Sequence, residues 1–457
     1  MSWAFRKRLL SSLKSSLWVV PAFATLAAFL SVPLLRLLDR RVGFEFFRYT
    51  PEGARAVASI VSAAMLSFVV LFFSVLLLTV QIASSALSPR IISRPFRSRK
   101  LKASLALFVF TLIYSMAVVA RGTEGNIGQL ATAMVIVLTV VSICVFLFVV
   151  EHVSKQLRPA TMMADIAADG LRVIRAVYPQ MVEEKDGVEQ AVEEASLDLP
   201  LRVIRHRGNH PGAVQALDVK GLIDIAIRNA CTIEVVPQVG EFVTSHDEVF
   251  RIYANGAGIS DEELFHHIAL ERERTLEQDP AFAFRIIVDI AAKALSPAIN
   301  DPTTAVLALD QIHILLREVG WRRLDNGIVH DSNGKLRLVY RTPNWEDFVA
   351  LALTEIRQFG GGSTQVARRM LAMLEDLIPL LPVHRALTLR KELDLLKSTV
   401  DHSFAIPEDR MLAEFPDHQG LGGTQKQPAS RRAARQGGAS EDAAADRAKA
   451  VPIHDLR

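Results

Sequence analysis

The residues of this 457-residue chain that could do chemistry gather in two polar segments. The first runs from Glu271 to Asp279 and the second from Ser296 to Thr304, on either side of an apolar stretch. Asp279 and Asp301 each precede a proline, which predicts that each of them begins a helix. Because helix N-termini attract anions, two of them beside an arginine could hold a phosphate or another small anion. The candidate ligand pocket comprises Arg274, Thr275, Asp279, Asn300, Asp301 and Thr303.

The same two segments also fit a structural role. Residues 282–295 between them are expected to form an apolar helix that carries Arg285, Asp289 and Lys293. Charged residues four apart on a helix face one another, so these side chains could form ion pairs instead of serving a ligand. In this alternative the two aspartates only cap helices, and the sequence leaves both interpretations open.

Signatures of known catalytic sites are absent from the sequence. There is no phosphate-binding loop, nucleophile elbow, zinc-protease motif or paired C-x-x-C motif. His266, His267 and Glu271 could offer metal ligands, but a surface helix explains them more simply. Residues 360–364 (GGGST) could cradle an anion, but they lack the lysine of a nucleotide site and fit a helix connector better. We therefore predict that the chain is not an enzyme and has no catalytic residue, metal ion or cofactor.

Four apolar segments are long enough to cross a membrane, for which about 20 helical residues are needed. They are residues 17–35, the stretch between Arg55 and Arg90, residues 103–120 and residues 126–150. The first is too long for the apolar part of a cleaved signal peptide. We therefore expect a transmembrane domain of four helices at residues 17–150.

The second segment carries a regular polar stripe. Ser67, Ser74, Gln81 and Ser88 recur every seven residues, nearly two helical turns, and Ser85 joins them on one face. Small polar residues at this spacing often pack helix against helix, and in an oligomer they could also line a pore. No ionisable residue lies in the middle of any segment, which argues against a transporter that carries protons on a buried carboxylate.

Lysine and arginine predict the orientation of the spans. They are enriched in residues 1–16 and in residues 90–102, whereas the first and third loops carry acidic residues as well. By the positive-inside rule, both termini are expected in the cytoplasm of a multi-pass inner-membrane protein. The net charge of only +3 suggests no nucleic-acid partner.

The remaining two-thirds of the chain is expected to be an α+β cytoplasmic region. Residues 151–199 form a juxtamembrane helix and an acidic linker, and residues 200–256 alternate like the strands of a small β-rich module. Residues 257–410 form a helical domain that begins with a helix at residues 261–272 and includes a hairpin at residues 324–340. Past Phe415 the chain has almost no large apolar residue, which predicts a disordered tail at residues 411–457.

Several motifs in the sequence are long and ordered: residues 73–75, 81–85, 88–90, 114–115, 240–243, 274–275, 278–280 and 296–302. Together they resemble a bacterial family of predicted membrane proteins known as domain of unknown function 2254. The resemblance covers about residues 15–400 and implies four spans and a cytoplasmic C-terminal region, with no activity to carry over.

Two functions are compatible with these features. The first is an oligomeric channel or passive transport protein that is gated by its cytoplasmic domain. The alternative is a membrane-anchored signalling or scaffold protein whose cytoplasmic domain binds an anion or another ligand. Both imply the lipid bilayer as a partner, and the first also implies further copies of the chain and a small ion.

Overall fold

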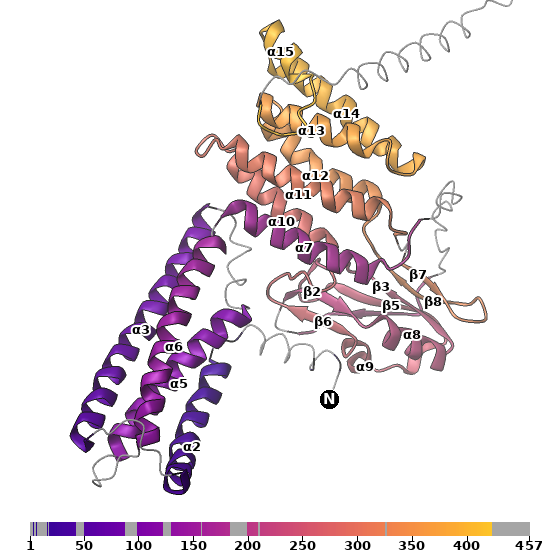
Figure 1. The fold of residues 1–457 in the computed structure, drawn as a ribbon. Coiled ribbons are helices and arrows are strands. Elements are labelled where there is room, and N and C mark those ends of the chain that lie inside the picture. Colours follow the sequence, from indigo (N-terminus) through magenta and orange to yellow (C-terminus); the bar gives the residue numbers. More distant parts are fainter. Residues whose placement is uncertain are drawn as a thin grey trace, which may run out of the picture.

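The computed structural model describes residues 18–42, 50–86, 98–121, 129–156, 158–182, 199–208, 211–324 and 327–422, together with Trp3, Arg6 and Ser16. A bundle of long apolar helices at the N-terminal end is followed by an α+β region (Figure 1). The acidic residues 183–198 lie outside the described part of the chain.

The N-terminal bundle consists of α2 (Val19–Val42), α3 (Pro51–Ala86), α5 (Arg99–Arg121) and α6 (Gln129–Gln156). Three of these helices are long and apolar enough to span a membrane, over Pro51–Ile82, Arg99–Ala120 and Gln129–Gln156. In α2 the apolar stretch, Val19–Leu34, is shorter. The structure thus supports three of the four predicted spans, and the fourth stays a prediction.

Helix α5 lies at the centre of this bundle and packs against the other three helices. Its small polar side chains point inward: Ser62 of α3 donates to the hydroxyl of Ser115 at 2.8 Å, and the hydroxyls of Thr111 and Ser142 are 3.2 Å apart. Phenylalanine rings fill the space between these contacts, as in the edge-to-face pair of Phe68 with a ring of α6. Polar groups inside and apolar groups outside is the arrangement expected in lipid.

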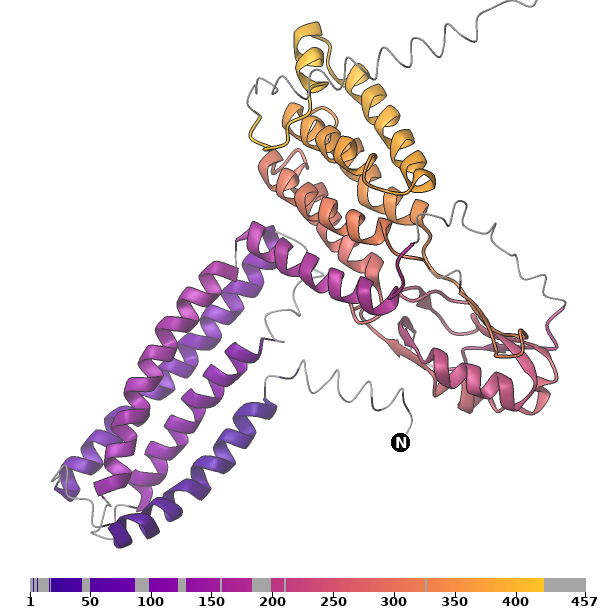
Figure 2. The same cartoon turned by 45° about the vertical axis from the view of Figure 1, so that its right-hand side comes forward.

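The α+β region begins with α7 (Pro159–Val177), which leads from the end of the membrane bundle towards the sheets (Figure 2). Helix α7 shares one hydrophobic core with the helices of the C-terminal half. These helices are α10 (Pro280–Ala294), α11 (Pro302–Gly320), α12 (Trp345–Gly360), α13 (Thr364–Leu377), α14 (Val383–Ser403) and α15 (Pro407–Ala413). Gly170 lets α7 approach closely, because a Cβ there would lie 2.7 Å from the Cβ of Ala283.

Two sheets form a second core with α8 (Val219–Arg228). The five-stranded sheet has the order β1-β5-β3-β8-β7, and the three-stranded sheet has the order β4-β2-β6. The strands are β1 (Arg202–Arg205), β2 (Gly212–Leu217), β3 (Cys231–Val235), β4 (Phe242–Val243), β5 (Glu248–Ala254), β6 (Ile268–Glu271), β7 (Ile328–His330) and β8 (Leu336–Tyr340). All neighbours pair antiparallel except β3 and β8, which are parallel.

The structure corrects two predictions about local elements. The single helix expected at residues 261–272 is a short helix, α9 (Asp261–Phe265), followed by strand β6. Pairing with β2 makes β6 a strand, and periodicity within such a short segment does not reveal that partner. The hairpin was expected within the helical domain, but its strands β7 and β8 instead extend the five-stranded sheet. Strand β8 pairs with β3, and its Leu338 is buried in the core of the sheets.

The structure also describes part of the segment that was predicted to be a disordered tail. Residues 411–422 are described, and Asp417 and Gly420 are buried against the helices. Few large apolar side chains are needed there, because the segment is attached by hydrogen bonds. Residues 423–457 lie outside the described part of the chain.

Candidate functional site

Helix α10 divides the predicted ligand pocket into two groups of residues. Its 15 residues span about 22 Å at 1.5 Å per residue. Arg274, Thr275 and Asp279 lie before its first residue. Asn300, Asp301 and Thr303 lie beyond its last residue, where the amide of Asp301 donates to the carbonyl of Ala294 at 2.7 Å. The structure therefore does not bring these six residues into one pocket.

Arg274 and Asp279 form a buried ion pair at the start of α10. Arg274 Nε donates to Asp279 Oδ2, and Asp279 Oδ1 accepts the amide of Phe282 at 3.1 Å and so caps the helix. The guanidinium carbon lies 5.3 Å from the ring centroid of Phe282, a cation–π contact. Asp279 is only 3% exposed, and this burial raises the pKa of its carboxyl despite the opposing effect of Arg274.

A second set of contacts ties this corner to strand β2. Gln215 lies at a bulge in the pairing of β2 with β6, and its side chain donates to the carbonyl of Glu273 and accepts from the hydroxyl of Thr275. Gln278 Oε1 accepts the amide of Leu217 at 3.0 Å. Six residues thus join the sheets to α10, and we call them the Arg274 junction: Gln215, Gly240, Arg274, Thr275, Gln278 and Asp279.

Gly240 completes the junction by leaving room for Arg274. Its φ of 90° is left-handed, and a Cβ at this position would collide with the Arg274 guanidinium. The pattern of the sequence alone did not indicate Gln215 or Gly240 as site residues. The signal for Gln215 was a single polar side chain in the apolar run GAVQAL, and its significance depends on the bulge that only sheet pairing reveals.

The second group forms a tight turn between α10 and α11. Asp301 caps α11 by accepting the amide of Thr304 at 3.1 Å and its hydroxyl at 2.5 Å. Asn300 has a left-handed φ of 48°, and its amide donates to the carbonyl of Ser296 at 2.9 Å. Asn300 and Thr303 are exposed. These contacts account for Asp301 as a helix cap.

Between the two groups, Arg285 fixes α10 to α12. Its Nε lies 2.7 Å from Asp289 Oδ1 on the same helix, as the spacing predicted. Its two terminal nitrogens lie 2.5 and 2.7 Å from the carboxylate oxygens of Glu355 on α12. The charged side chains of α10 therefore include a structural network of the kind that the second interpretation described.

The histidine pair has structural contacts as well. His267 Nδ1 lies 2.9 Å from Asp218 Oδ2, and Asp218 Oδ1 accepts the amide of Gly221 and caps α8. His266 is half-exposed and lies 3.9 Å from Glu262. Within the described ranges, no group of three or more histidine, cysteine, aspartate or glutamate side chains could hold a metal ion. In the GGGST segment, Gly360 and Gly361 allow close contacts with neighbouring helices, so this connector is tightly packed.

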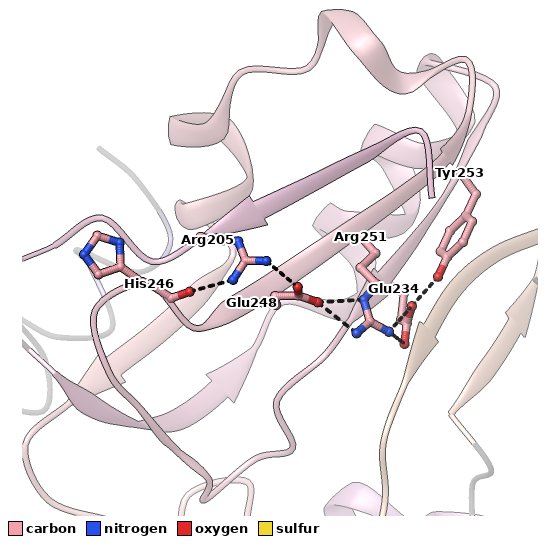
Figure 3. A network of polar contacts seen from close by, with 6 residues as sticks. All are labelled: Arg205, Glu234, His246, Glu248, Arg251 and Tyr253. Carbon is pink, nitrogen blue, oxygen red and sulfur yellow. Dashed lines mark hydrogen bonds and ion pairs between the residues drawn. The ribbon is translucent and has the colours of Figure 1, made fainter. Parts of the chain in front are cut away.

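The open face of the five-stranded sheet carries a chain of charges (Figure 3). Arg205 contacts Glu248 at 2.7 Å, Glu248 contacts Arg251 at 2.8 Å, and Arg251 contacts Glu234 at 3.3 Å. Tyr253 donates to Glu234 at 2.6 Å, and burial together with this hydrogen bond raises the pKa of the phenol to about 12. Positive and negative side chains therefore alternate across three adjacent strands, and each of these charges has a partner of opposite sign.

The polar stripe of α3 faces away from the helices of its own chain. Ser67, Ser74 and Gln81 are all exposed on the outer surface of the bundle. The two serine hydroxyls donate to carbonyls one turn earlier in α3, at 3.3 and 3.0 Å. The side chain of Ser85 and the whole of Ser88 lie outside the described part of the chain.

Contacts with α5 show where this stripe lies along the bundle. The rings of Phe72 and Phe108 pack 6.0 Å apart, and the chains run antiparallel, so Gln81 lies level with Arg99 at the basic start of α5. Each seven-residue step advances about 10 Å along the helix. The stripe therefore extends from the middle of the bundle to its basic end.

Helix α3 also exposes large apolar side chains such as Leu66 and Leu77, whereas the described outer surfaces of α2 and α6 carry no comparable row of polar residues. Their exposed large side chains are apolar, as expected for helices in contact with lipid. They include Phe23, Leu26 and Leu30 on α2, and Val137, Val140 and Leu147 on α6. Among the helices that the structure describes, only α3 combines a long apolar segment with an outward row of serines and a glutamine.

These features define a membrane protein with several apolar helices and a large α+β region beyond them. The chain belongs to the family described as "predicted membrane protein", domain of unknown function 2254, whose profile matches residues 14–376. It is 28% identical over 423 residues to uncharacterised proteins of Mycobacterium tuberculosis and Mycobacterium bovis, covering 89% of this chain and 80% of each relative. No solved structure matches it.

Proposed function

We propose that this protein is an oligomeric channel or passive transport protein of the inner membrane, gated by its cytoplasmic domain. In the oligomer, the outer faces of α3 from neighbouring copies enclose a polar path. The observation that carries the proposal is the outward orientation of Ser67, Ser74 and Gln81 on a helix long enough to span the bilayer. The hydroxyls of Ser67 and Ser74 can donate within α3, but a glutamine amide in a membrane helix usually faces protein or water, because lipid offers it no hydrogen-bond partner.

The other helices support the same arrangement. In this proposal α2 and α6 face lipid with apolar side chains, and the face of α3 that carries the polar stripe contacts a second copy. In this proposal α2 is the fourth span, and both termini lie on the cytoplasmic side with the basic start of α5. Gln81 then lies at the cytoplasmic end of the path, where an amide can contact water and a partially dehydrated ion.

A gate also needs a rigid connection between the α+β region and the bundle. Helix α7 follows α6 and is fixed to α11 by Arg175, whose Nη2 lies 2.9 Å from Glu318 Oε2. Gly170 packs directly on α10, and the Arg274 junction ties α10 to the sheets. A movement of the sheets or of the helical domain would thus reach the end of α6 through continuous contacts.

Cysteine labelling tests the polar path. Full-length protein carrying Ser74→Cys is reconstituted in liposomes and treated with a charged, water-soluble thiol reagent. We expect the introduced thiol to react, because it would face water. Native Cys144 is the matched control, since it is exposed on the apolar outer face of α6 and should react only with a membrane-permeant reagent. Equal protection of both thiols would rule out the path.

Flux measurements test transport itself. Liposomes containing the wild-type protein should pass small ions, and Ser74→Phe and Gln81→Leu should each change that flux. Leu147→Phe, a similar increase in size on the outer face of α6, should leave it unchanged. Absence of flux across several salts, with oligomers verified by cross-linking, would contradict the proposal.

A second candidate function is a membrane-anchored signalling or scaffold protein that binds a small anion. The continuous contacts through α7 favour it equally, because they would transmit binding as readily as gating. The anion would compete with Asp279 for Arg274, so binding would require this ion pair to open. A phosphate-induced rise in the melting temperature of the full-length protein, lost in Arg274→Ala, would support this function, and no rise in the wild type would contradict it.

A further inference from the structure

Residues 415–422 form a short irregular segment that lies against α13 after the end of α15. Arg368 of α13 donates from Nε to the carbonyl of Phe415 at 2.9 Å and from Nη1 to the carbonyl of Gly422 at 3.0 Å. Gln365, one turn earlier, donates to the carbonyl of Gly420 at 2.7 Å. The segment is therefore held along its whole length by side chains of a single helix.

Asp417 gives this segment its shape. Its carboxylate is 3% exposed and accepts main-chain amides of Gln419 at 3.0 Å, Gly420 at 3.0 Å and Gly422 at 2.7 Å. Gly420 and Gly422 both have left-handed φ values, of 68° and 77°, which side chains rarely adopt. The pattern D-x-x-G-x-G thus encodes a turn that wraps around its own carboxylate.

The segment also covers the contact between α11 and α13. A Cβ on Gly420 would lie 2.6 Å from Cγ1 of Val306 on α11. Beside it, Arg369 Nε lies 2.7 Å from Asp310 on α11. Detachment of residues 415–422 would expose Arg368 and Arg369 to solvent, and both are almost fully buried in the attached state.

Attachment depends on hydrogen bonds rather than on apolar burial. The two largest apolar side chains of the segment stay in solvent, with Phe415 54% and Leu421 78% exposed. By contrast, the preceding helix α15 is anchored in the hydrophobic core by Ala413. Segments that bury little apolar surface open with much smaller free energies than the core to which they are attached.

We propose that residues 415–422 are a detachable strap that occupies a peptide-binding groove between α11 and α13. The groove recognises a segment folded into a D-x-x-G-x-G turn through Arg368, Gln365 and Val306. In the attached state the chain fills its own groove. When the strap opens, Arg368 and Arg369 become accessible to a second segment of the same pattern. The strap thereby regulates access to this face of the helical domain.

Hydrogen exchange on the full-length protein tests whether the strap opens separately. Asp417→Ala removes the acceptor of three amides, so we expect exchange in residues 415–422 to accelerate about tenfold or more while α10 and α12 stay protected. Gln419→Ala is the matched control, because Gln419 contributes only its main-chain amide and its side chain is exposed. Unchanged exchange in Asp417→Ala, or a general loss of protection in the helices, would overturn the proposal.

A peptide tests the groove directly. A labelled synthetic peptide of residues 415–422 should bind the full-length Asp417→Ala protein in fluorescence anisotropy at least about tenfold more tightly than the wild type, whose groove is already filled. The same peptide with aspartate replaced by alanine should not bind. Equal affinity for both proteins would show that the strap does not occupy a recognition groove.

Discussion

Asp279 and Asp301 offer a matched comparison of two helix caps. Each aspartate precedes a proline and accepts the amide three residues later at 3.1 Å, so each should contribute a similar capping free energy, about 1 kcal/mol. Asp279 is in addition buried and paired with Arg274, whereas the Asp301 carboxylate accepts, within the described part of the chain, only the hydroxyl of Thr304 besides its capping bond. Replacing each by alanine therefore separates the cap from the ion pair.

The structure sets the expected magnitudes. Removing one partner of a fully buried ion pair costs about 3–5 kcal/mol, because the other charge is left without a counterion. Arg274 is 34% exposed and can regain part of its hydration, so we expect a smaller loss, about 1–3 kcal/mol beyond the cap. Asp279→Ala should thus lower the free energy of unfolding by about 2–4 kcal/mol, and Asp301→Ala by about 1 kcal/mol.

Chemical denaturation of the full-length protein in detergent, followed by helical circular dichroism, measures both values. The double variant Arg274→Met with Asp279→Ala should recover part of the loss, because no unpaired guanidinium remains. Equal destabilisation by Asp279→Ala and Asp301→Ala would refute the reasoning. It would mean that the Arg274–Asp279 pair contributes nothing beyond the cap.

Three further predictions concern other contacts. Gly170→Leu should lower the melting temperature by several degrees, because overpacking against α10 costs about 1–3 kcal/mol, whereas Ala168→Leu on the exposed face of α7 should not. The hydrogen bond from Arg175 lowers the pKa of Glu318 below its ordinary value of 4.5. The ionised Glu318 therefore stabilises the folded state fully above pH 4.5, and this stabilisation is lost as the pH falls through the lowered pKa. The stability difference between the wild type and Glu318→Gln should accordingly shrink in acid-titrated unfolding curves, and a constant difference would contradict this. A double-mutant cycle on Ser62→Ala and Ser115→Ala should give a coupling free energy of about 0.6 kcal/mol. Zero coupling would mean that the 2.8 Å hydrogen bond between the two serines adds no net stability.

Helices with a strong internal signal were predictable from the sequence. The apolar runs of α3, α5 and α6 are long enough to be recognised without any partner, and Asp301-Pro302 marks the start of α11 by capping chemistry alone. The separation of four residues between Arg285 and Asp289 likewise predicted an ion pair that the structure contains.

Strand assignments depended on partners that are distant in the sequence. Strand β6 was expected to continue a helix, because four residues do not distinguish the two periodicities. Its pairing with β2, more than 50 residues earlier in the chain, decides the conformation. The same holds for β8, whose parallel pairing with β3 moves the hairpin from the helical domain into the sheet.

The sequence by itself determined the apolar spans, the helix caps and the periodicity of the polar stripe, because each follows from interactions between near neighbours. Only the tertiary structure decided that α10 separates Arg274 from Asn300, and that Gln215 and Gly240 complete the corner around Arg274. Only the packing of the bundle decided that the stripe of α3 points outward, because which face of a helix is covered depends on where its neighbours lie.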